Sequence, residues 1–521
     1  MKLRLKCTLA VVLCLLLIGF AACSAPAASS SPTPGVSESS APSAEGPGVQ
    51  EIGLPAHMKE PSTPKYVFLF IGDGMAFAQV NAAQAFMGSG GGEQPAIGSL
   101  SFTRFPVTGI VTTFDETSVC PDSASTATAL SCGIKTQSGV VGMTGDKASA
   151  PQSITEMLKN DGKKIGIVSS VSPNNATPAA FYAHVASRGA YYDIAAQMPV
   201  SVVDYFGGGS LVDASGAKGD KPEVFGMLTQ NGYTIADTKE EIAALGGGMG
   251  KVYAVSPALQ TKGAMPFSMD ASKDDLTLAD FVRAGISVLD NDNGFFMVCE
   301  SGLIDWACHA NDAAAAISET LVLDDAVSAA VAFAQEHPDE TLILVTGDHE
   351  TGGMAIGYAS TGYTTNLSLL SGQTVSYSAF DVIFEAMKKD NPQLLMSDIL
   401  PAVKQYFGLL APDDADAALK ENKARVLTAD EYKRLADALD ASLKGQPDTV
   451  DTQLLYGGYE PLTVTLTHLV NNKAGIGWTS YVHTGGLVPV YAYGARAEAF
   501  GGSYDNTDIF KKLVAVCGLD K

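Results

Sequence analysis

The chain has 521 residues, of which 46% are hydrophobic and 17% are charged, and this composition supports a large core. Its formal net charge of −23 becomes −26 when residues 1–22, with three positive charges and no negative ones, are removed. Such acidity argues against nucleic acid as a partner and repels anionic substrates at long range. Any phosphate chemistry must therefore bring its own positive charge.

Residues 1–22 predict an export signal, because a basic start is followed by an apolar run that ends in small residues before Cys23. This pattern resembles a bacterial lipoprotein signal. The resemblance implies that Cys23 is lipidated and that the mature chain is anchored on the extracytoplasmic face of the cell membrane. The alternative is an uncleaved membrane anchor, for which the apolar run is slightly short.

Residues 23–62 are rich in Ser, Pro, Ala and Gly and contain almost no bulky apolar side chain. Such a segment cannot bury enough surface to fold, so we expect a disordered tether. The catalytic domain is then predicted to span residues 63–521.

Four short, continuously apolar runs predict buried parallel strands. They lie at residues 66–71, 164–168, 294–298 and 341–345. Helical stretches separate them, for instance Ser153–Asn160 and Ala313–Glu336. This alternation predicts an α/β fold, with an open, mostly parallel sheet covered by helices on both faces.

Two regions differ from this pattern. Residues 200–265 are Gly-rich and loop-like, with short strands at best. Residues 360–460 are polar and acidic, with helical patches at 380–389, 413–423 and 428–444. We expect the second region to be a mostly helical insertion lying over the sheet.

An odd number of cysteines follows Cys23, without the spacing of a disulfide framework. They are Cys120, Cys132, Cys299, Cys308 and Cys517. A helix of about nine residues would hold the first two roughly 13 Å apart, too far for a bridge. We expect mostly buried free thiols, although an exported protein leaves a bridge possible.

The segment Pro121–Leu130 follows an extended run at 109–114 and predicts a helix that begins near Ser123. Free backbone N–H groups and the helix dipole at such a point bind phosphate and stabilise a serine alkoxide. The alternative is that Ser123 is an ordinary N-cap, since serine is a preferred capping residue.

Polar clusters follow several of the predicted strands, where ligands bind in open α/β sheets. Asp73 follows the first strand between two glycines, although Asp there is often a turn residue. Glu300 ends another strand, and Asp305 and His309 are four residues apart, so a helix places both on one face. That spacing suits zinc or a similar ion, with a surface ion pair as the alternative.

Two further clusters carry histidine. Asp348 and His349 lie among glycines at a strand end, where both can turn toward one cavity unless the segment is an ordinary loop. His483 follows an extended stretch, and alone it is weak evidence. The chain has seven histidines, and three of them fall in these clusters beside carboxylates.

In this order along the chain, the clusters resemble the motifs of alkaline phosphatases. The motifs are Ile71-Gly72-Asp73-Gly74, Asp122-Ser123-Ala124-Ser125, Glu300 with Asp305 and His309, Asp348-His349, and His483-Thr484-Gly485. The segment Ala176–Ala180 and Arg188 match as well. The resemblance covers about residues 65–500 apart from the insertion, and six motifs in order are highly specific.

The resemblance implies a centre with two zinc ions and a third, magnesium-like site. The ligands of the first zinc would be Asp305, His309 and His483. The ligands of the second, which also meets Ser123, would be Asp73, Asp348 and His349. The third ion would be held by Thr177, Glu300 and the shared Asp73.

Two zinc ions suit an in-line phosphoryl displacement in which Ser123 becomes a phosphoserine. Arg188 would hold two phosphoryl oxygens with its bidentate fork, oriented by Asp122. The four ligand carboxylates and Arg188 give this part of the site a charge of −3, which two zinc ions change to +1. We therefore expect the metal-free protein to bind phosphate poorly.

Two positions depart from the family's commonest residues. Asn175 stands where the family often has Asp or His, so the third site is expected to be weaker or differently occupied. Trp306 stands where some members have Lys or His, although others also have Trp. Trp306 provides no cation beside the phosphate. The alternative is that its role is to pack against other side chains.

The sequence thus predicts a tethered, exported phosphomonoesterase that acts on small phosphomonoesters above neutral pH. Family members are often dimers, so a homodimer is a further possibility. A phosphodiesterase or sulfatase on the same scaffold is one alternative, which the Asp122-Ser123 pair and Arg188 disfavour. A zinc- or phosphate-binding surface lipoprotein without activity is another, and the complete set of ligand positions argues against it.

Overall fold

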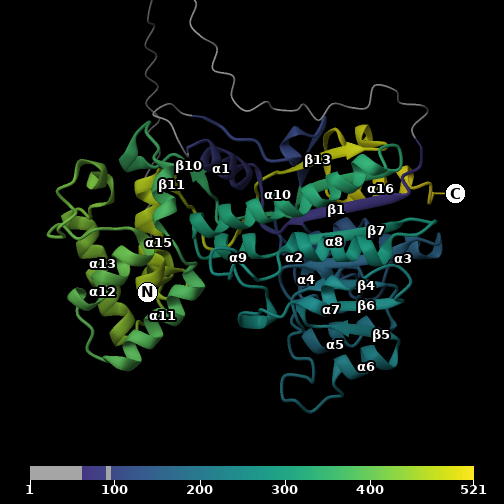
Figure 1. Ribbon diagram of the computed structural model, residues 1–521, viewed down its shortest axis with the longest axis horizontal. Helices are drawn as coiled ribbons and strands as arrows, with labels where there is room; N and C mark the ends of the chain where they lie inside the picture. Colours follow the sequence, from purple (N-terminus) through teal and green to yellow (C-terminus); the bar gives the residue numbers. More distant parts are fainter. Residues whose placement is uncertain (1–61, 90–95, 521) are drawn as a thin grey trace, which may run out of the picture. The chain divides into compact units, whose positions relative to one another are not determined.

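The computed structural model describes residues 62–89 and 96–520 (Figure 1). The predicted export signal, the lipidation site Cys23 and nearly all of the predicted tether lie outside the described residues. Within the described part of the chain, no helix combines the length and the apolar character that crossing a bilayer requires.

A single large sheet forms the centre of the fold. From one edge to the other, its strands are β14 (Gly502–Asp505), β2 (Val107–Thr112), β13 (Val488–Gly494), β8 (Thr341–Gly347), β1 (Tyr66–Gly72), β7 (Phe295–Ser301), β3 (Lys164–Ser169), β4 (Tyr205–Gly208), β6 (Lys251–Val255) and β5 (Tyr233–Ala236). Only β13 runs antiparallel to its neighbours β2 and β8. The predicted open, mostly parallel sheet is confirmed.

Strand β1 shows why both faces of the sheet are covered. All of its residues are buried, and successive side chains point to opposite faces. Phe68 and Phe70 join one hydrophobic core, whereas Leu69 and Ile71 join the other. A strand buried on both faces reads as a continuous apolar run, which is the pattern that the sequence shows.

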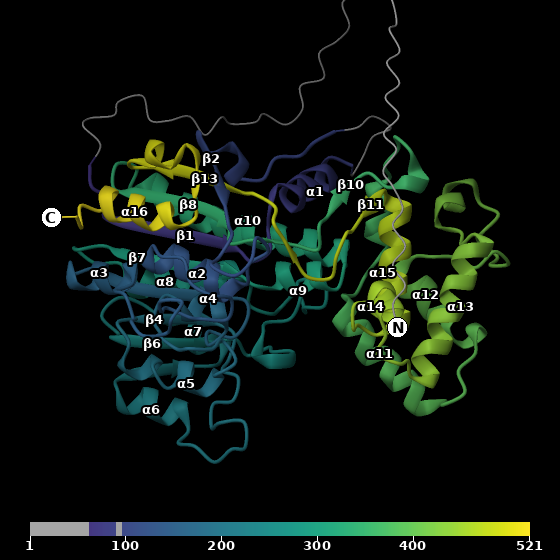
Figure 2. The ribbon, with the colours of Figure 1, turned by 180° about the vertical axis from the view of Figure 1, so that it is seen from behind.

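Helices pack on both of these faces (Figure 2). One face carries α1 (Phe77–Gly88), α8 (Leu278–Leu289), α9 (Leu303–His309) and α10 (Ala313–Glu336). The other carries α2 (Ser123–Cys132), α3 (Ile154–Asn160), α4 (Ala176–Ala179), α5 (Tyr191–Ala195) and α16 (Thr507–Val516). The helices expected at 153–160 and 313–336 are therefore present, the first with Ser153 as its N-cap.

The register of the parallel strands aligns their carboxyl ends. Gly72 at the end of β1 pairs with Ser301 of β7 and with Gly347 of β8. Asp73, Glu300 and Asp348 therefore emerge at one edge of the sheet, which is where open α/β sheets bind ligands.

Residues 200–265 contain more regular structure than expected. The strands β4, β6 and β5 are short, as predicted, yet they extend the main sheet. Two unpredicted helices lie between them, α6 (Val224–Gln230) and α7 (Lys239–Ala243). Their N-termini are stabilised by the capping side chains of Glu223 and Thr238.

The insertion is helical but differs from the prediction in detail. Its helices are α11 (Tyr377–Asp390), α12 (Met396–Phe407), α13 (Ala429–Lys444) and α14 (Val450–Tyr456). The helices expected at 380–389 and 428–444 are confirmed. The helix expected at 413–423 is wrong, because turns precede a short 3-10 helix, η6 (Lys420–Arg425). Helix α12 was not predicted, and Pro401 lies inside it.

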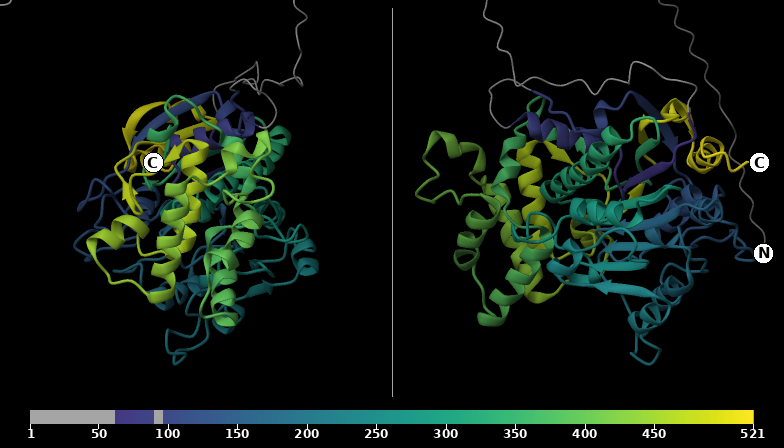
Figure 3. Two further views of the ribbon diagram at one scale, coloured as in Figure 1. Left: turned by 90° about the vertical axis from the view of Figure 1, so that its left-hand side faces the viewer. Right: turned by 45° about the vertical axis from the view of Figure 1, so that its right-hand side comes forward.

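The insertion does not lie over the sheet as expected. Its helices pack around α15 (Pro461–Ala474) and form a group beside the sheet, as the different views agree (Figures 1 and 3). Their apolar faces bury Phe380, Val403 and Leu435 against this helix group rather than against strands. The α15 helix is buried along most of its length, so it acts as the core of the group.

Two small antiparallel pairs complete the fold. Strand β9 (Glu350–Thr351) pairs with β12 (His483–Thr484), and β10 (Ala355–Ile356) pairs with β11 (Ile476–Gly477). The remaining short 3-10 helices are η1 (Phe102–Arg104), η2 (Met198–Val200), η3 (Thr261–Gly263), η4 (Ala359–Thr361), η5 (Leu367–Gly372) and η7 (Ala497–Phe500). The five cysteines of the described residues are free thiols, and only Cys120 among them is exposed.

Candidate active site

Helix α2 begins at Ser123, and Asp122 is its N-cap. The Asp122 carboxylate accepts a hydrogen bond from Ser125 N at 3.0 Å. The alternative in which Ser123 caps the helix is therefore wrong. Ser123 is 2% exposed, and its Oγ lies 3.1 Å from His349 Nε2. The serine hydroxyl thus faces the clustered polar groups at the first turn of the helix.

Asp115 holds this turn in place, although no sequence motif points to it. Its Oδ2 accepts from Ser125 Oγ at 2.7 Å and from Ser138 Oγ at 2.5 Å, while Oδ1 accepts three bonds from Thr117 and Ser118. Burial raises the pKa of Asp115, but these hydrogen bonds outweigh it and hold the pKa below its usual range. Its only sequence signal is an Asp directly after the extended run at 109–114.

Arg188 lies beside the same turn. Its guanidinium donates to Asp122 Oδ2 at 3.0 Å and to Asn175 Oδ1 at 3.4 Å. Its backbone N–H donates to Gly139 O at 2.7 Å, in the turn that Ser138 begins. The structure therefore brings together the serine, the aspartate and the arginine that the sequence predicts to act on phosphate.

Asp305, His309 and His483 form what we call the imidazole cluster. Helix α9 places Asp305 and His309 on one face, and His309 Nε2 lies 3.4 Å from Asp305 Oδ2. His483 Nε2 lies 3.6 Å from Asp305 Oδ1 and 3.1 Å from His309 Nε2. The β9–β12 pair brings His483 to this place from far along the chain.

The outer nitrogens of these two histidines contact backbone carbonyls. His309 Nδ1 lies 2.6 Å from Tyr481 O, and His483 Nδ1 lies 2.6 Å from Pro121 O. Because a carbonyl only accepts, each Nδ1 carries a proton, and each ring directs its Nε2 into the cluster. The two Nε2 atoms face each other at 3.1 Å, a contact that a proton on one ring or a shared metal ion would stabilise. The cluster therefore fits zinc, whose ligands are imidazole nitrogen and carboxylate oxygen.

The second predicted set surrounds His349, which is fully buried. Its Nε2 lies 3.4 Å from both Asp73 Oδ1 and Asp348 Oδ2. Burial raises the pKa of Asp73 well above its usual range, and the nearby charge of Asp348 adds to this effect. For Asp305, burial also raises the pKa, but the charges of His309 and His483 outweigh it and lower the pKa.

Asp73, Thr177 and Glu300 form what we call the oxygen cluster. One side-chain oxygen of each, Asp73 Oδ1, Thr177 Oγ1 and Glu300 Oε1, is buried without a hydrogen-bond partner among the described residues. Burial raises the pKa of Glu300 to about 7, although its other oxygen accepts from Ser169. Buried oxygens without partners are costly, and three of them fit a hard cation such as magnesium.

Asn175 and Trp306 lie beside these clusters. Asn175 is the N-cap of α4, and its Oδ1 accepts from Ala176 N at 2.7 Å and from Arg188. Trp306 directly follows Asp305 on α9 and is half-buried against the core. Asn175 thus orients Arg188, and it also lies two residues before Thr177 in the sequence.

The sequence matches the alkaline phosphatase family model over residues 64–206 and 212–519. The chain belongs to the alkaline phosphatase family. It is 28% identical to alkaline phosphatase 3 of Bacillus subtilis over 465 residues, which cover 86% of this chain and 88% of that one.

Solved alkaline phosphatases share the fold. The cold-active enzyme from a psychrophilic Shewanella species has a TM-score of 0.69 and 26% identity, covering 87% of this chain and 99% of that one. A variant of the TAB5 alkaline phosphatase, described with Mg bound in its M3 site, has a TM-score of 0.60 and 28% identity. It covers 89% of this chain and 100% of that one. This alkaline phosphatase is thus a hydrolase of a metal-binding family.

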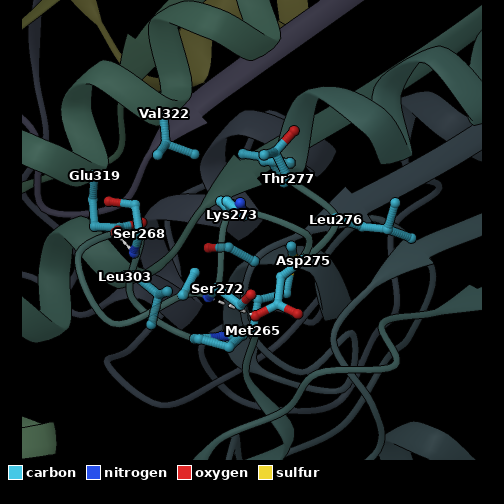
Figure 4. Close-up of a pocket in the computed structure, with 14 residues that line it drawn as sticks. Met265, Ser268, Ser272, Lys273, Asp275, Leu276, Thr277, Leu303, Glu319 and Val322 are labelled. Carbon is cyan, nitrogen blue, oxygen red and sulfur yellow. Dashed lines mark hydrogen bonds between the residues drawn. The ribbon is translucent and has the colours of Figure 1, made fainter. Parts of the chain in front are cut away.

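A separate cavity of about 230 Å³ lies between α10 and the segment that leads into α8 (Figure 4). Apolar side chains, including Met265, Leu303 and Val322, line much of it. The buried Glu319 also lines it, and this carboxylate accepts from Ser268 N at 2.7 Å. None of the predicted site residues faces this cavity.

Proposed function

We propose that this alkaline phosphatase hydrolyses small phosphomonoesters through a phosphoserine on Ser123 and releases phosphate and an alcohol. The observation that carries the proposal is the position of Ser123 Oγ, buried at the first turn of α2 and 3.1 Å from His349 Nε2. The imidazole cluster and the oxygen cluster both adjoin this serine through Asp73 and His349.

We further propose that the site holds two zinc ions and one magnesium ion. The imidazole cluster would bind the first zinc, and Asp73, Asp348 and His349 would bind the second. The oxygen cluster would bind magnesium, with Asn175 leaving that site without a further charge. When bound, these ions supply Lewis-acid stabilisation of the phosphoryl and serine oxygens.

The residues of this chain would act in two displacements. Ser123 loses its hydroxyl proton to solvent, and its Oγ forms a bond to phosphorus while the bond to the leaving alcohol oxygen breaks, so that this oxygen takes a proton from water. Arg188, held by Asp122, donates two hydrogen bonds to the non-bridging oxygens. Water then attacks the phosphorus, and the Ser123 oxygen leaves and regains its proton. A rising pH favours the deprotonated serine, so we expect activity above neutral pH.

The test is a panel of an aryl phosphomonoester, a phosphodiester and an aryl sulfate, each assayed with and without a chelator. We expect turnover of the monoester that the chelator abolishes. Ser123→Ala should lower turnover by at least about 10³-fold, as loss of a covalent nucleophile does. Ser131→Ala is the matched control, because Ser131 is a buried serine of the same helix outside the site. Full turnover by Ser123→Ala would overturn the proposal.

We also propose that the enzyme is exported, carries a lipid on Cys23 and acts as a homodimer on the extracytoplasmic face of the cell membrane. The basis is the signal-like start of the chain and the family's frequent dimerisation. Mass spectrometry of the mature N-terminus should detect the lipid on Cys23, and Cys23→Ala should release active enzyme from the membrane fraction. Light scattering of the released enzyme should give twice the mass of one chain.

A further inference from the structure

Lys262 lies on a tight loop beyond the carboxyl end of β6. The strand β6 runs parallel to β4, so this loop emerges at the same edge of the sheet as the site. Ser210 N donates to Gly263 O at 2.7 Å, and Met265 N donates to Ser170 O at 2.8 Å. These two bonds fix the loop to the segments that follow β4 and β3.

The backbone of Lys262 is held in an uncommon conformation. Its φ is 58°, in the left-handed region that residues other than glycine seldom adopt. Gln260 N donates to Ala264 O at 2.7 Å across the loop, so the strained residue is enclosed by a hydrogen bond. The packing of the loop, and not local preference, therefore holds the backbone from which the lysine side chain extends.

The side chain extends toward Trp306 of helix α9. Lys262 Nζ lies 5.9 Å from the centre of the Trp306 ring, within the range of a cation–π contact. Trp306 directly follows Asp305 of the imidazole cluster. Within residues 62–89 and 96–520, no acidic side chain forms an ion pair with Lys262. Its ammonium is exposed and remains available to an anion.

We propose that Lys262 is a second phosphate-binding cation of this enzyme, positioned at the rim of the site by Trp306. This inference rests on the proposed function. Arg188 is already paired with Asp122 at 3.0 Å, and the cluster carboxylates make the surroundings acidic. A free ammonium on a four-carbon stem can move from the indole to the outer oxygens of a bound phosphoryl group. It would strengthen binding of the substrate and of the phosphate product to a similar degree.

The experiment compares charge reversal at two lysines of the metal-loaded enzyme. Lys262→Glu changes the proposed cation, and Lys273→Glu is the matched control. Lys273 is an exposed lysine farther along the same connection, where it lines the separate cavity. Both variants change the net charge equally. The readouts are KM, kcat and the inhibition constant of inorganic phosphate at low and high salt.

At low salt, we expect Lys262→Glu to raise KM and the phosphate inhibition constant by about five- to tenfold, as a single nearby charge does. The value of kcat should change by no more than about twofold, because ground state and transition state lose the same contact. The loss should shrink in about 0.5 M salt. Lys262→Arg should resemble the parent enzyme, and Lys273→Glu should change neither constant.

Equal inhibition constants for Lys262→Glu and Lys273→Glu would overturn the inference, as would a loss in Lys262→Arg that matches that of Lys262→Glu. The Ser123→Ala variant separates this failure from that of the proposed function. If Ser123→Ala is inactive while Lys262→Glu binds phosphate normally, only the role of Lys262 is wrong. If Ser123→Ala is fully active, the proposed mechanism itself is wrong.

Discussion

The imidazole cluster and the oxygen cluster are adjacent but are built in different ways. In the imidazole cluster, backbone carbonyls fix His309 and His483 through their outer nitrogens, so both rings are oriented by the chain itself. In the oxygen cluster, Asp73, Thr177 and Glu300 each keep a buried oxygen that has no hydrogen-bond partner in the described part of the chain. The first cluster is preorganised, whereas the second costs the folded chain free energy until a cation binds.

Of the two clusters, the preorganised one is expected to give the larger effect. His309→Ala removes a predicted zinc ligand, and we expect turnover to fall by more than about 100-fold, since losing an outer-shell partner alone costs 10–100-fold. Elemental analysis should show about one zinc ion fewer per chain. His337→Ala is the control, because His337 lies at the end of α10 outside the clusters. Unchanged zinc content in His309→Ala would contradict the ligand assignment.

Glu300→Gln tests the oxygen cluster, and we expect turnover to fall by about 10–100-fold. Its effect on stability should reverse with metal. The metal-free variant should melt at a higher temperature than the metal-free parent, because a buried carboxylate without a full set of partners is replaced by a neutral amide. With metal, the variant should melt at a lower temperature. If both forms shift in the same direction, the two clusters do not differ as described.

Asp115→Asn tests how far the serine turn depends on its support, and we expect kcat to fall about tenfold with little change in KM. An amide accepts at one oxygen only, so it cannot keep the bonds from Ser125 and Ser138 together with those from Thr117. Asp146→Asn is the control, because Asp146 makes similar turn contacts on the surface. A change confined to a higher KM would place the role of Asp115 in substrate binding instead.

The smallest effect concerns Glu319, outside both clusters, where burial raises the pKa to about 7. Between the pKa of the unfolded state, near 4.3, and 7, the folded chain holds a proton that the unfolded chain releases. The free energy of unfolding therefore falls as pH rises through this window. Relative to the metal-free parent, Glu319→Gln should gain roughly 2 kcal/mol between pH 5 and pH 8. A pH-independent difference in unfolding would show that Glu319 keeps an ordinary pKa.

The main sheet was predictable because its central strands are buried on both faces and read as apolar runs. The structure of the insertion was less predictable from the sequence. Helix α12 contains Pro401, which usually interrupts a helix, and the polar stretch at 413–423 resembles a helix although turns occupy most of it. The position of the insertion beside the sheet depends on helix α15. This helix is almost completely buried, and its sequence shows no amphipathic pattern that would predict this burial.

The residues that we propose to bind phosphate and metal carry recognisable motifs, so the sequence can single them out. The groups that hold these residues in position carry no such motif. Asp115 acts through Ser125 and Ser138, residues separated from it by 10 and 23 positions, and no local pattern links them. The backbone carbonyls of Tyr481 and Pro121, which orient two histidines, have no side-chain signature at all. Such partners follow from the fold and become visible only in three dimensions.

The β10–β11 pair has a consequence for how the length of this chain can vary. Ile356 pairs with Ile476, so the polypeptide leaves the α/β unit and returns to it at one point. A segment whose two ends lie side by side can be lengthened, shortened or replaced without altering the spacing of the central strands at whose ends the candidate site lies. The length of this segment can therefore vary while the strands beside the candidate site keep their places.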